Sequence, residues 1–134
     1  MAHQFSVALR NARLDAIEAT IGTSAILRIR TGAPPANVAA ADTGTILVEM
    51  TLPSDWMAAA SSGAKAMSGT WQDASANAGG TAGHFRIYSS GGTAHWQGTV
   101  TATGGGGDMT LDNTTISAGQ TVTITSCTLT EGNA

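Results

Sequence analysis

The sequence GHFRIYSSGGTAHWQGTV, residues 83–100, decides the fold of this chain. Apolar and polar residues alternate over 83–88 and again over 94–100, and the turn-forming sequence SSGGT lies between the two runs. Alternation with a period of two is typical of a strand that buries one face, and a short Gly-rich connection joins such strands into a hairpin. The stretch therefore predicts an antiparallel β-hairpin.

The register of this hairpin divides its side chains between two faces. Closing the turn over residues 89–94 places Tyr88 opposite His95 and His84 opposite Thr99. In this register the buried face holds Phe85, Ile87, Trp96 and Val100, and the other face holds His84, Arg86, Tyr88, His95, Gln97 and Thr99.

Two functions suit the second face, which is rich in aromatic, histidine and arginine side chains. A subunit interface is the preferred interpretation, because tyrosine and arginine are enriched where proteins meet. A platform on which rings stack against sugars is the alternative. We therefore expect Arg86, Tyr88, His95 and Gln97 to contact another protein subunit.

The residues that could carry chemistry form no recognisable site. His84 and His95 are expected four strand steps apart, roughly 13 Å at about 3.3 Å per residue, too far to share an ion that each ligand must approach to about 2 Å. The tetraglycine at 104–107 lacks the Lys and Ser/Thr of a phosphate loop, and Cys127 has no CxxC partner. We expect no catalytic residue, metal or cofactor, and hence no enzyme.

Further alternating segments lie on both sides of the hairpin. They are bounded by Gly- and Pro-rich turns, as expected of short strands in an all-β domain. The predicted strands are 25–30, 45–52, 64–71, 109–113 and 120–129. Residues 23–134 are therefore predicted to form a β-sandwich or jelly-roll-like domain.

Residues 6–21 carry the one convincing helical pattern. Val7, Leu14, Ile17 and Ile21 follow one another at spacings of seven, three and four, so they share a helix face. Ser6 is a suitable cap and Gly22 a suitable stop, which places a helical arm at residues 1–22. These four apolar side chains are expected to contact a neighbouring subunit.

The composition favours assembly. The chain has 134 residues, enough for one domain, and only 11% of them are charged, against about 25% in an average soluble domain. A surface with few charges costs little to bury, and depletion of charge marks the core of an interface. We expect a homo-oligomer, a trimer or a dimer; the alternative is a monomer with a bland polar surface.

Several partners are disfavoured by the sequence. The net charge is −3 and the six basic residues do not cluster, so no binding to nucleic acid is expected. No run of about 18 apolar residues predicts a membrane span. Residues 1–5 lack the basic start and apolar run of a signal peptide, which favours assembly in the cytoplasm of the producing cell.

Several segments resemble a family of small virion structural proteins of tailed bacteriophages. They are GHFRIY at 83–88, QGTVTATGGGGDM at 97–109, RNARLDAIE at 10–18, LPSDW at 52–56 and the ending from QTVTI at 120–124 to Asn133. The resemblance covers nearly the whole chain.

The resemblance implies a place in a virion assembled in the host cytoplasm. It favours a head decoration or cement protein, used in many copies, that stabilises the shell by binding major capsid subunits or other virion proteins. The alternative is a module associated with the tail tube or a tail fibre. In that role the His84/Arg86/Tyr88/His95 face would contact host glycans.

Overall fold

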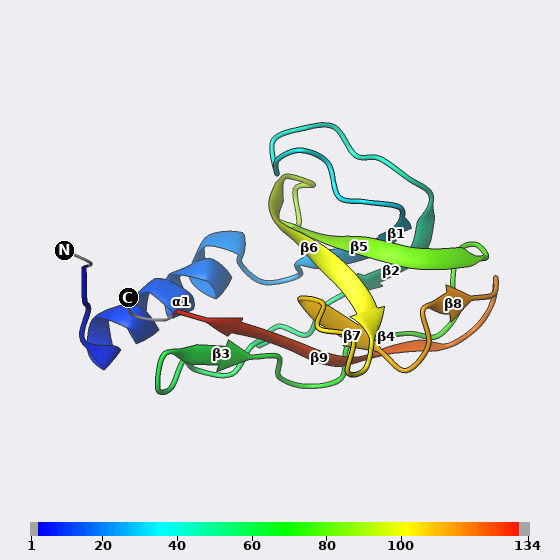
Figure 1. The fold of residues 1–134 in the computed structure, drawn as a ribbon. Coiled ribbons are helices and arrows are strands. Elements are labelled where there is room, and N and C mark those ends of the chain that lie inside the picture. The colour runs from blue at the N-terminus through cyan, green and yellow to red at the C-terminus, as the bar shows by residue number, and fades with distance from the viewer. Residues whose placement is uncertain (1–2, 132–134) are drawn as a thin grey trace.

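The computed structural model describes residues 3–131 as a mainly β protein with one N-terminal helix and a curled sheet (Figure 1). The helix is α1 (Val7–Ile21), and the strands are β1 (Ile26–Thr31), β2 (Ile46–Thr51), β3 (Ala64–Ala66), β4 (Gln72–Asp73), β5 (Gly80–Tyr88), β6 (Ala94–Ala102), β7 (Met109–Leu111), β8 (Thr115–Ile116) and β9 (Val122–Thr130). The predicted fold class is confirmed at this level.

The strands follow one hydrogen-bonded path in the order β2-β1-β5-β6-β7-β9-β3, with β4 beside β9 and β8 beside β5. Only β6 and β7 pair in parallel among the described strands. The amide of Glu49 in β2 donates to Asp73 Oδ2 in β4 (3.1 Å), and the Asn77 amide donates to the Leu47 carbonyl (2.8 Å). The sheet thus curls until β2 meets β4. A two-sheet sandwich or a jelly roll is not confirmed.

The hairpin of β5 and β6 has the predicted register except at its turn. His84 lies opposite Thr99, as expected. Tyr88, however, pairs with Ala94, because the register shifts by one residue between Ile87 and Tyr88. The prediction that Tyr88 faces His95 is wrong: His95 is the extra residue of a β-bulge, which alternation alone does not reveal.

Four aromatic rings form the centre of the core. The ring centroids of Trp56 and Trp71 lie 6.0 Å apart, those of Trp56 and Trp96 6.5 Å, and Phe85 meets Trp96 edge-on at 5.4 Å. Trp56 Nε1 donates to the Gly22 carbonyl (3.1 Å), so the end of α1 is tied to this cluster. The few aromatic side chains of the core are therefore clustered in one place.

Helix α1 begins after Ser6, whose hydroxyl accepts from the Leu9 amide (3.2 Å), and ends at Gly22, as predicted. Its second half packs on the β domain, where Leu14 and Ile21 are buried and Ile17 is half-buried. Lys65 of β3 binds Asp15 (2.8 Å) and Glu18 (3.2 Å) of the helix. The first turn lies at the end of the molecule, where Val7, Ala8 and Leu9 are exposed (Figure 1).

The glycine at position 83 is required by a close approach of two backbones. A Cβ atom at Gly83 would lie 2.2 Å from the Gly32 carbonyl oxygen. We expect Gly83→Ala to lower the free energy of unfolding by about 1–3 kcal/mol, the usual cost of overpacking. Gly91→Ala is the control, because the nearest atom to its Cβ is Ser89 Oγ at 3.9 Å. Equal urea-denaturation midpoints for the two variants would contradict this account.

Candidate interaction surfaces

The loop of residues 32–44, here called the cover loop, lies on the polar face of β5. His84 Nδ1 is 2.9 Å from the Gly32 carbonyl oxygen, and Gln97 Nε2 donates to the Pro35 carbonyl (2.8 Å). Arg86 donates to the carbonyls of Val38 and Ala40. The side chains of β5 and β6 thus hold the loop by its main chain.

Asp42 is the carboxylate that closes this network. Its Oδ1 accepts from Arg86 and from the Tyr88 hydroxyl (2.7 Å), and its Oδ2 accepts from Arg30 of β1 (2.8 Å). Partial burial disfavours the ionised form of Asp42. The hydrogen bonds from Tyr88 and Arg86 and the charges of Arg30 and Arg86 outweigh that effect, so the pKa of Asp42 is lowered.

Tyr88 contacts Arg28 through its ring and Asp42 through its hydroxyl. The Arg28 guanidinium carbon lies 4.8 Å from the centroid of the Tyr88 ring, and Arg28 also pairs with Glu49 of β2. Burial raises the pKa of Tyr88, and the hydrogen bond to Asp42 and the charge of Asp42 raise it further. The phenol therefore stays a hydrogen-bond donor to the carboxylate at neutral pH.

The predicted contact face of the hairpin is thus occupied by the chain itself. Arg86 is 1% exposed and Tyr88 3% exposed. Gln97 is half-buried against Pro35, and only His95 among the four predicted contact residues is exposed. The expectation of a free polar face is corrected here, because the carbonyls of the cover loop and Asp42 accept hydrogen bonds from these side chains.

The predicted contact residues of the helix are also divided. Leu14 and Ile21 are buried and Ile17 is half-buried against the domain, whereas Val7 is 47% exposed. Val7 therefore remains available to a neighbour, and the other three are used mainly within the chain.

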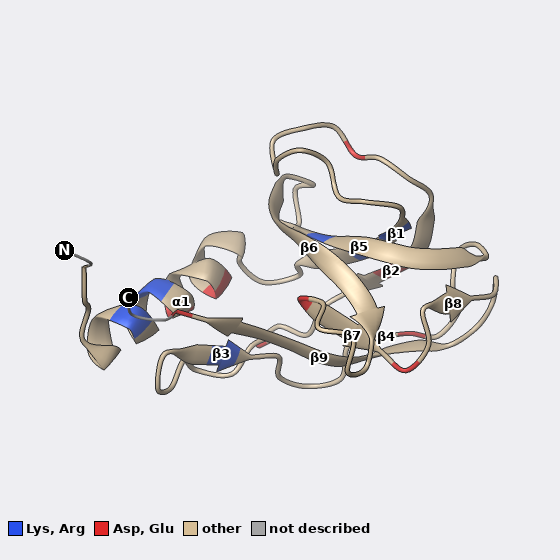
Figure 2. Cartoon of the chain, viewed as in Figure 1, with Lys and Arg blue, Asp and Glu red and all other residues tan. Residues whose placement is uncertain are grey.

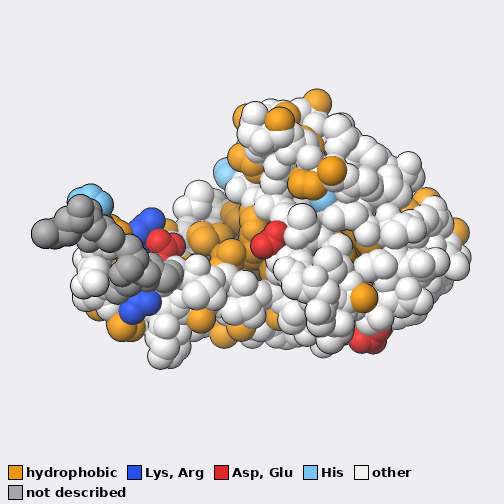
Figure 3. Space-filling view, in the orientation of Figure 1, with side chains coloured by type: hydrophobic (Ala, Val, Ile, Leu, Met, Phe, Trp, Pro, Cys, Tyr) orange, Lys and Arg blue, Asp and Glu red, His pale blue; other side chains and the backbone are white. Residues whose placement is uncertain are grey.

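A shallow groove runs between α1 and the start of β6. It is lined by Arg13, Ala16, Ile17, Thr20, Ile21 and His95. Figure 3 shows hydrophobic side chains gathered in the hollow between the helix and the rest of the molecule. The groove brings His95 beside Ile17 and Ile21, predicted contact residues from two distant segments.

The outer face of β9 carries hydroxyl groups and no charge. The register between β9 and β7 shifts between Thr110 and Leu111. Because of this shift, Val122 and Ile124 before it on β9 and Cys127 after it are all buried in the core. The exposed residues of β9 are Thr123, Thr125, Ser126, Thr128 and Thr130. The Thr110 hydroxyl bonds to those of Thr125 and Ser126 (2.7 Å each), so this hydroxyl face is partly satisfied within the chain.

Figure 2 marks the few Lys and Arg residues of the chain, and most of those in the described residues form internal ion pairs. Arg13 binds Glu131, Arg28 binds Glu49, Arg30 and Arg86 bind Asp42, and Lys65 binds Asp15 and Glu18. Arg10 forms no ion pair within residues 3–131 and donates instead to the Glu131 carbonyl (3.0 Å). Little positive charge is left for a polyanionic partner.

Side chains that bind metal ions are not clustered in residues 3–131. No three or more His, Cys, Asp or Glu side chains of this part of the chain are placed to hold one metal ion. Cys127 is 1% exposed, and burial, followed by the charge of Asp108, raises its thiol pKa to about 12. A thiol that stays protonated is a poor nucleophile. No described helix is long and apolar enough to cross a membrane.

Fold and surfaces together define the class: a mainly β protein with one N-terminal helix, a curled sheet and a largely uncharged exterior. Comparison of the chain with protein-family models, with curated proteins and with solved structures found no match.

Asp42 is expected to hold the cover loop in place. Asp42→Asn should lower the free energy of unfolding, because it leaves the buried guanidinium of Arg86 without its anion. Asp42 is partly exposed, and solvent screening limits the expected loss to about 2 kcal/mol. Chemical denaturation measures this change. Asp55→Asn is the control, since Asp55 is exposed and forms no ion pair in the described chain.

The same pair should show a defined dependence on pH. The folded pKa of Asp42 is lowered, so its contribution is complete above the unfolded value of about 3.9 and is lost as the pH falls through the folded value. The difference in stability between wild type and Asp42→Asn should therefore shrink as the pH falls from about 6 towards about 2. A constant difference across that range would contradict the assignment.

Proposed function

We propose that this chain is a structural protein of a tailed-bacteriophage particle, a head decoration or cement protein that stabilises the shell by binding major capsid subunits. It acts through buried surface, with no chemical step. The phage assignment is supported by the resemblance of several sequence segments to small virion proteins. The hydroxyl face of β9 is the observation that carries the binding role.

The hydroxyl face suits a permanent protein contact. Burying an ionised group costs far more than burying a hydroxyl that keeps a partner. The five exposed side chains of β9 carry no charge, and two of them already bond to Thr110. A capsid surface that adds hydrogen bonds to this face gains stability with little desolvation cost.

Many copies and a symmetric arrangement follow from this role. Shell proteins that bind at symmetry axes form closed rings, so a dimer or a trimer is the natural unit. The groove beside His95 and the exposed first turn of α1 leave surface for contacts between copies.

The tail-associated module is the alternative. In that role the His84/Arg86/Tyr88/His95 face would contact host glycans, and the burial of His84, Arg86 and Tyr88 beneath the cover loop counts against that contact. The tail location itself stays a prediction, which the copy number per particle distinguishes from the head location.

Charge introduced on the hydroxyl face should weaken binding to heads. We expect the double variant Thr123→Glu/Thr128→Glu to bind purified heads of the encoding phage at least tenfold more weakly, since two carboxylates would have to be desolvated. Cosedimentation of the variant with heads that lack the wild-type chain measures the affinity.

Two controls separate this surface from a general effect of charge. Thr123→Ser/Thr128→Ser keeps both hydroxyls and should bind like wild type. Ser90→Glu adds a carboxylate in the exposed turn between β5 and β6 and should also bind normally. Wild-type protein that does not bind heads, or that is present in only a few copies at the tail, would reject the proposal.

A further inference from the structure

The sheet has an opening between β6 and β9. Strand β7 has three residues, and it pairs with β6 only through Val100, Thr101 and Ala102. On β9 it pairs with residues no later than Cys127. In the part of the chain that the structure describes, residues 94–98 of β6 and 128–130 of β9 thus have no strand between them, and we name this gap the β6–β9 opening.

The β6–β9 opening has an apolar floor. Ile17, Trp96 and Leu129 pack against the core but remain only partly buried. The groove lined by Ile17, Ile21 and His95 continues along α1 from the start of β6. At its other end Asp108, which directly precedes β7, accepts from the Thr99 amide (2.9 Å). The opening therefore offers two strand edges, hydrophobic side chains between them and a carboxylate at one end.

A segment of the same sequence has the pattern that such a site accepts. Phe5, Val7 and Leu9 are 38%, 47% and 46% exposed. On a helix, residues two positions apart do not share a face, so Val7 and Leu9 cannot contact one partner surface together. In an extended strand, residues 5, 7 and 9 share one face, with the small Ser6 and Ala8 on the other.

Charge favours this segment as the occupant. Residues 3–13 contain Arg10 and Arg13 and no carboxylate. The carboxylates that form no ion pair within residues 3–131 all lie in the β domain: Asp55, Asp73, Asp108 and Asp112. Arg10 is the one arginine without an ion pair in that range, and it directly follows Leu9. A strand that enters parallel to β7 brings Arg10 towards Asp108.

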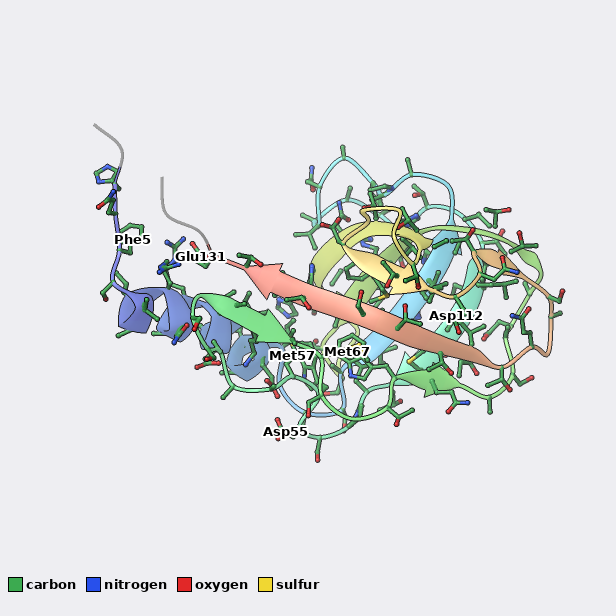
Figure 4. All side chains as sticks on the ribbon, turned by 60° about the horizontal axis from the view of Figure 1, so that its bottom comes forward. Phe5, Asp55, Met57, Met67, Asp112 and Glu131 are labelled. Atoms are coloured by element: carbon green, nitrogen blue, oxygen red, sulfur yellow. The ribbon has the colours of Figure 1, made fainter. Side chains whose placement is uncertain are left out.

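A second copy of the chain is a better source of residues 5–9 for the β6–β9 opening than the same molecule. Within one molecule Arg10 is held at the Glu131 carbonyl (3.0 Å). Phe5 lies beside Glu131 at the end of the molecule opposite Asp112 (Figure 4). The Arg13 guanidinium carbon lies 5.3 Å from the centroid of the Phe5 ring, a contact that insertion must replace. Residues 5–9 match in length residues 94–98, whose edge away from β5 has no strand partner within residues 3–131.

We propose that residues 5–9 of a second copy unwind from the first turn of α1 and insert as a β-strand into the β6–β9 opening. Phe5, Val7 and Leu9 then cover Ile17, Trp96 and Leu129, and the main chain of the insert pairs with the two free edges. Mutual exchange between two copies closes a symmetric dimer. The inference deepens the proposed role in assembly, but it concerns only contacts between copies and not the hydroxyl face.

Sedimentation equilibrium of the full-length chain tests the donor. Wild type should form a dimer, and Val7→Asp/Leu9→Asp should weaken the dimer at least tenfold. Ser6→Asp/Ala8→Asp is the matched control, because positions 6 and 8 face away in the inserted strand; it adds the same two charges to the same exposed segment and should leave the dimer intact. Circular dichroism confirms that each variant is folded.

A synthetic peptide of residues 3–10, HQFSVALR, tests the acceptor. Added to the Val7→Asp/Leu9→Asp protein, it should bind one to one and shift the amide NMR signals of residues 94–98 and 128–130. The same peptide carrying both aspartates should do neither.

Three outcomes would overturn the inference. They are a monomeric wild type, a dimer indifferent to Val7→Asp/Leu9→Asp, and peptide binding that leaves the signals of residues 94–98 unchanged. A monomeric wild type in which residues 5–9 of the same molecule occupy the opening is one case of the first outcome. Binding to heads through the hydroxyl face would be unaffected by any of them, so the two proposals fail separately.

Discussion

The carboxylate of Asp42, which two arginines and a tyrosine share, holds strands β1 and β5 and the cover loop together. Arg86 is almost fully buried, and a buried guanidinium is tolerable only when an anion and further acceptors surround it. Asp42 supplies the anion and the cover loop supplies the carbonyls. Because Arg30 and Tyr88 meet the same carboxylate, strands β1 and β5 and the loop are fixed relative to one another. Strand β5 is consequently buried on both faces, apolar packing on one and a polar network on the other.

Much of the backbone arrangement followed from local patterns. Alternation with glycine-rich turns located the β5–β6 hairpin and most of its register, and the Ser6 and Gly22 signals bounded α1. These features depend on residues close in sequence. The bulge at His95 was missed, because one extra residue in a strand leaves the apolar alternation on each side intact.

The candidate site was less predictable for a physical reason. A strand with one polar face usually exposes that face, and the polar residues of β5 fitted that rule. The cover loop has no periodicity, so no sequence pattern paired Asp42 with Arg86 or the Pro35 carbonyl with Gln97. The buried arginine was the available hint: such a residue near the centre of an apolar strand needs a carboxylate, and Asp42 is the one carboxylate of the cover loop. The helix residues Leu14 and Ile21 were correctly placed on one apolar face, but that face packs mainly on its own domain.

The way the cover loop is attached has an evolutionary corollary. His84, Gln97 and Arg86 reach main-chain carbonyls at Gly32, Pro35, Val38 and Ala40, and only Asp42 contributes its side chain. A carbonyl is present whatever residue stands at a position, so substitutions at Val38, Ala39 or Ala40 leave the anchors in place. The outward side chains of this segment can therefore vary, and new binding properties can evolve there without lowering the stability of the domain.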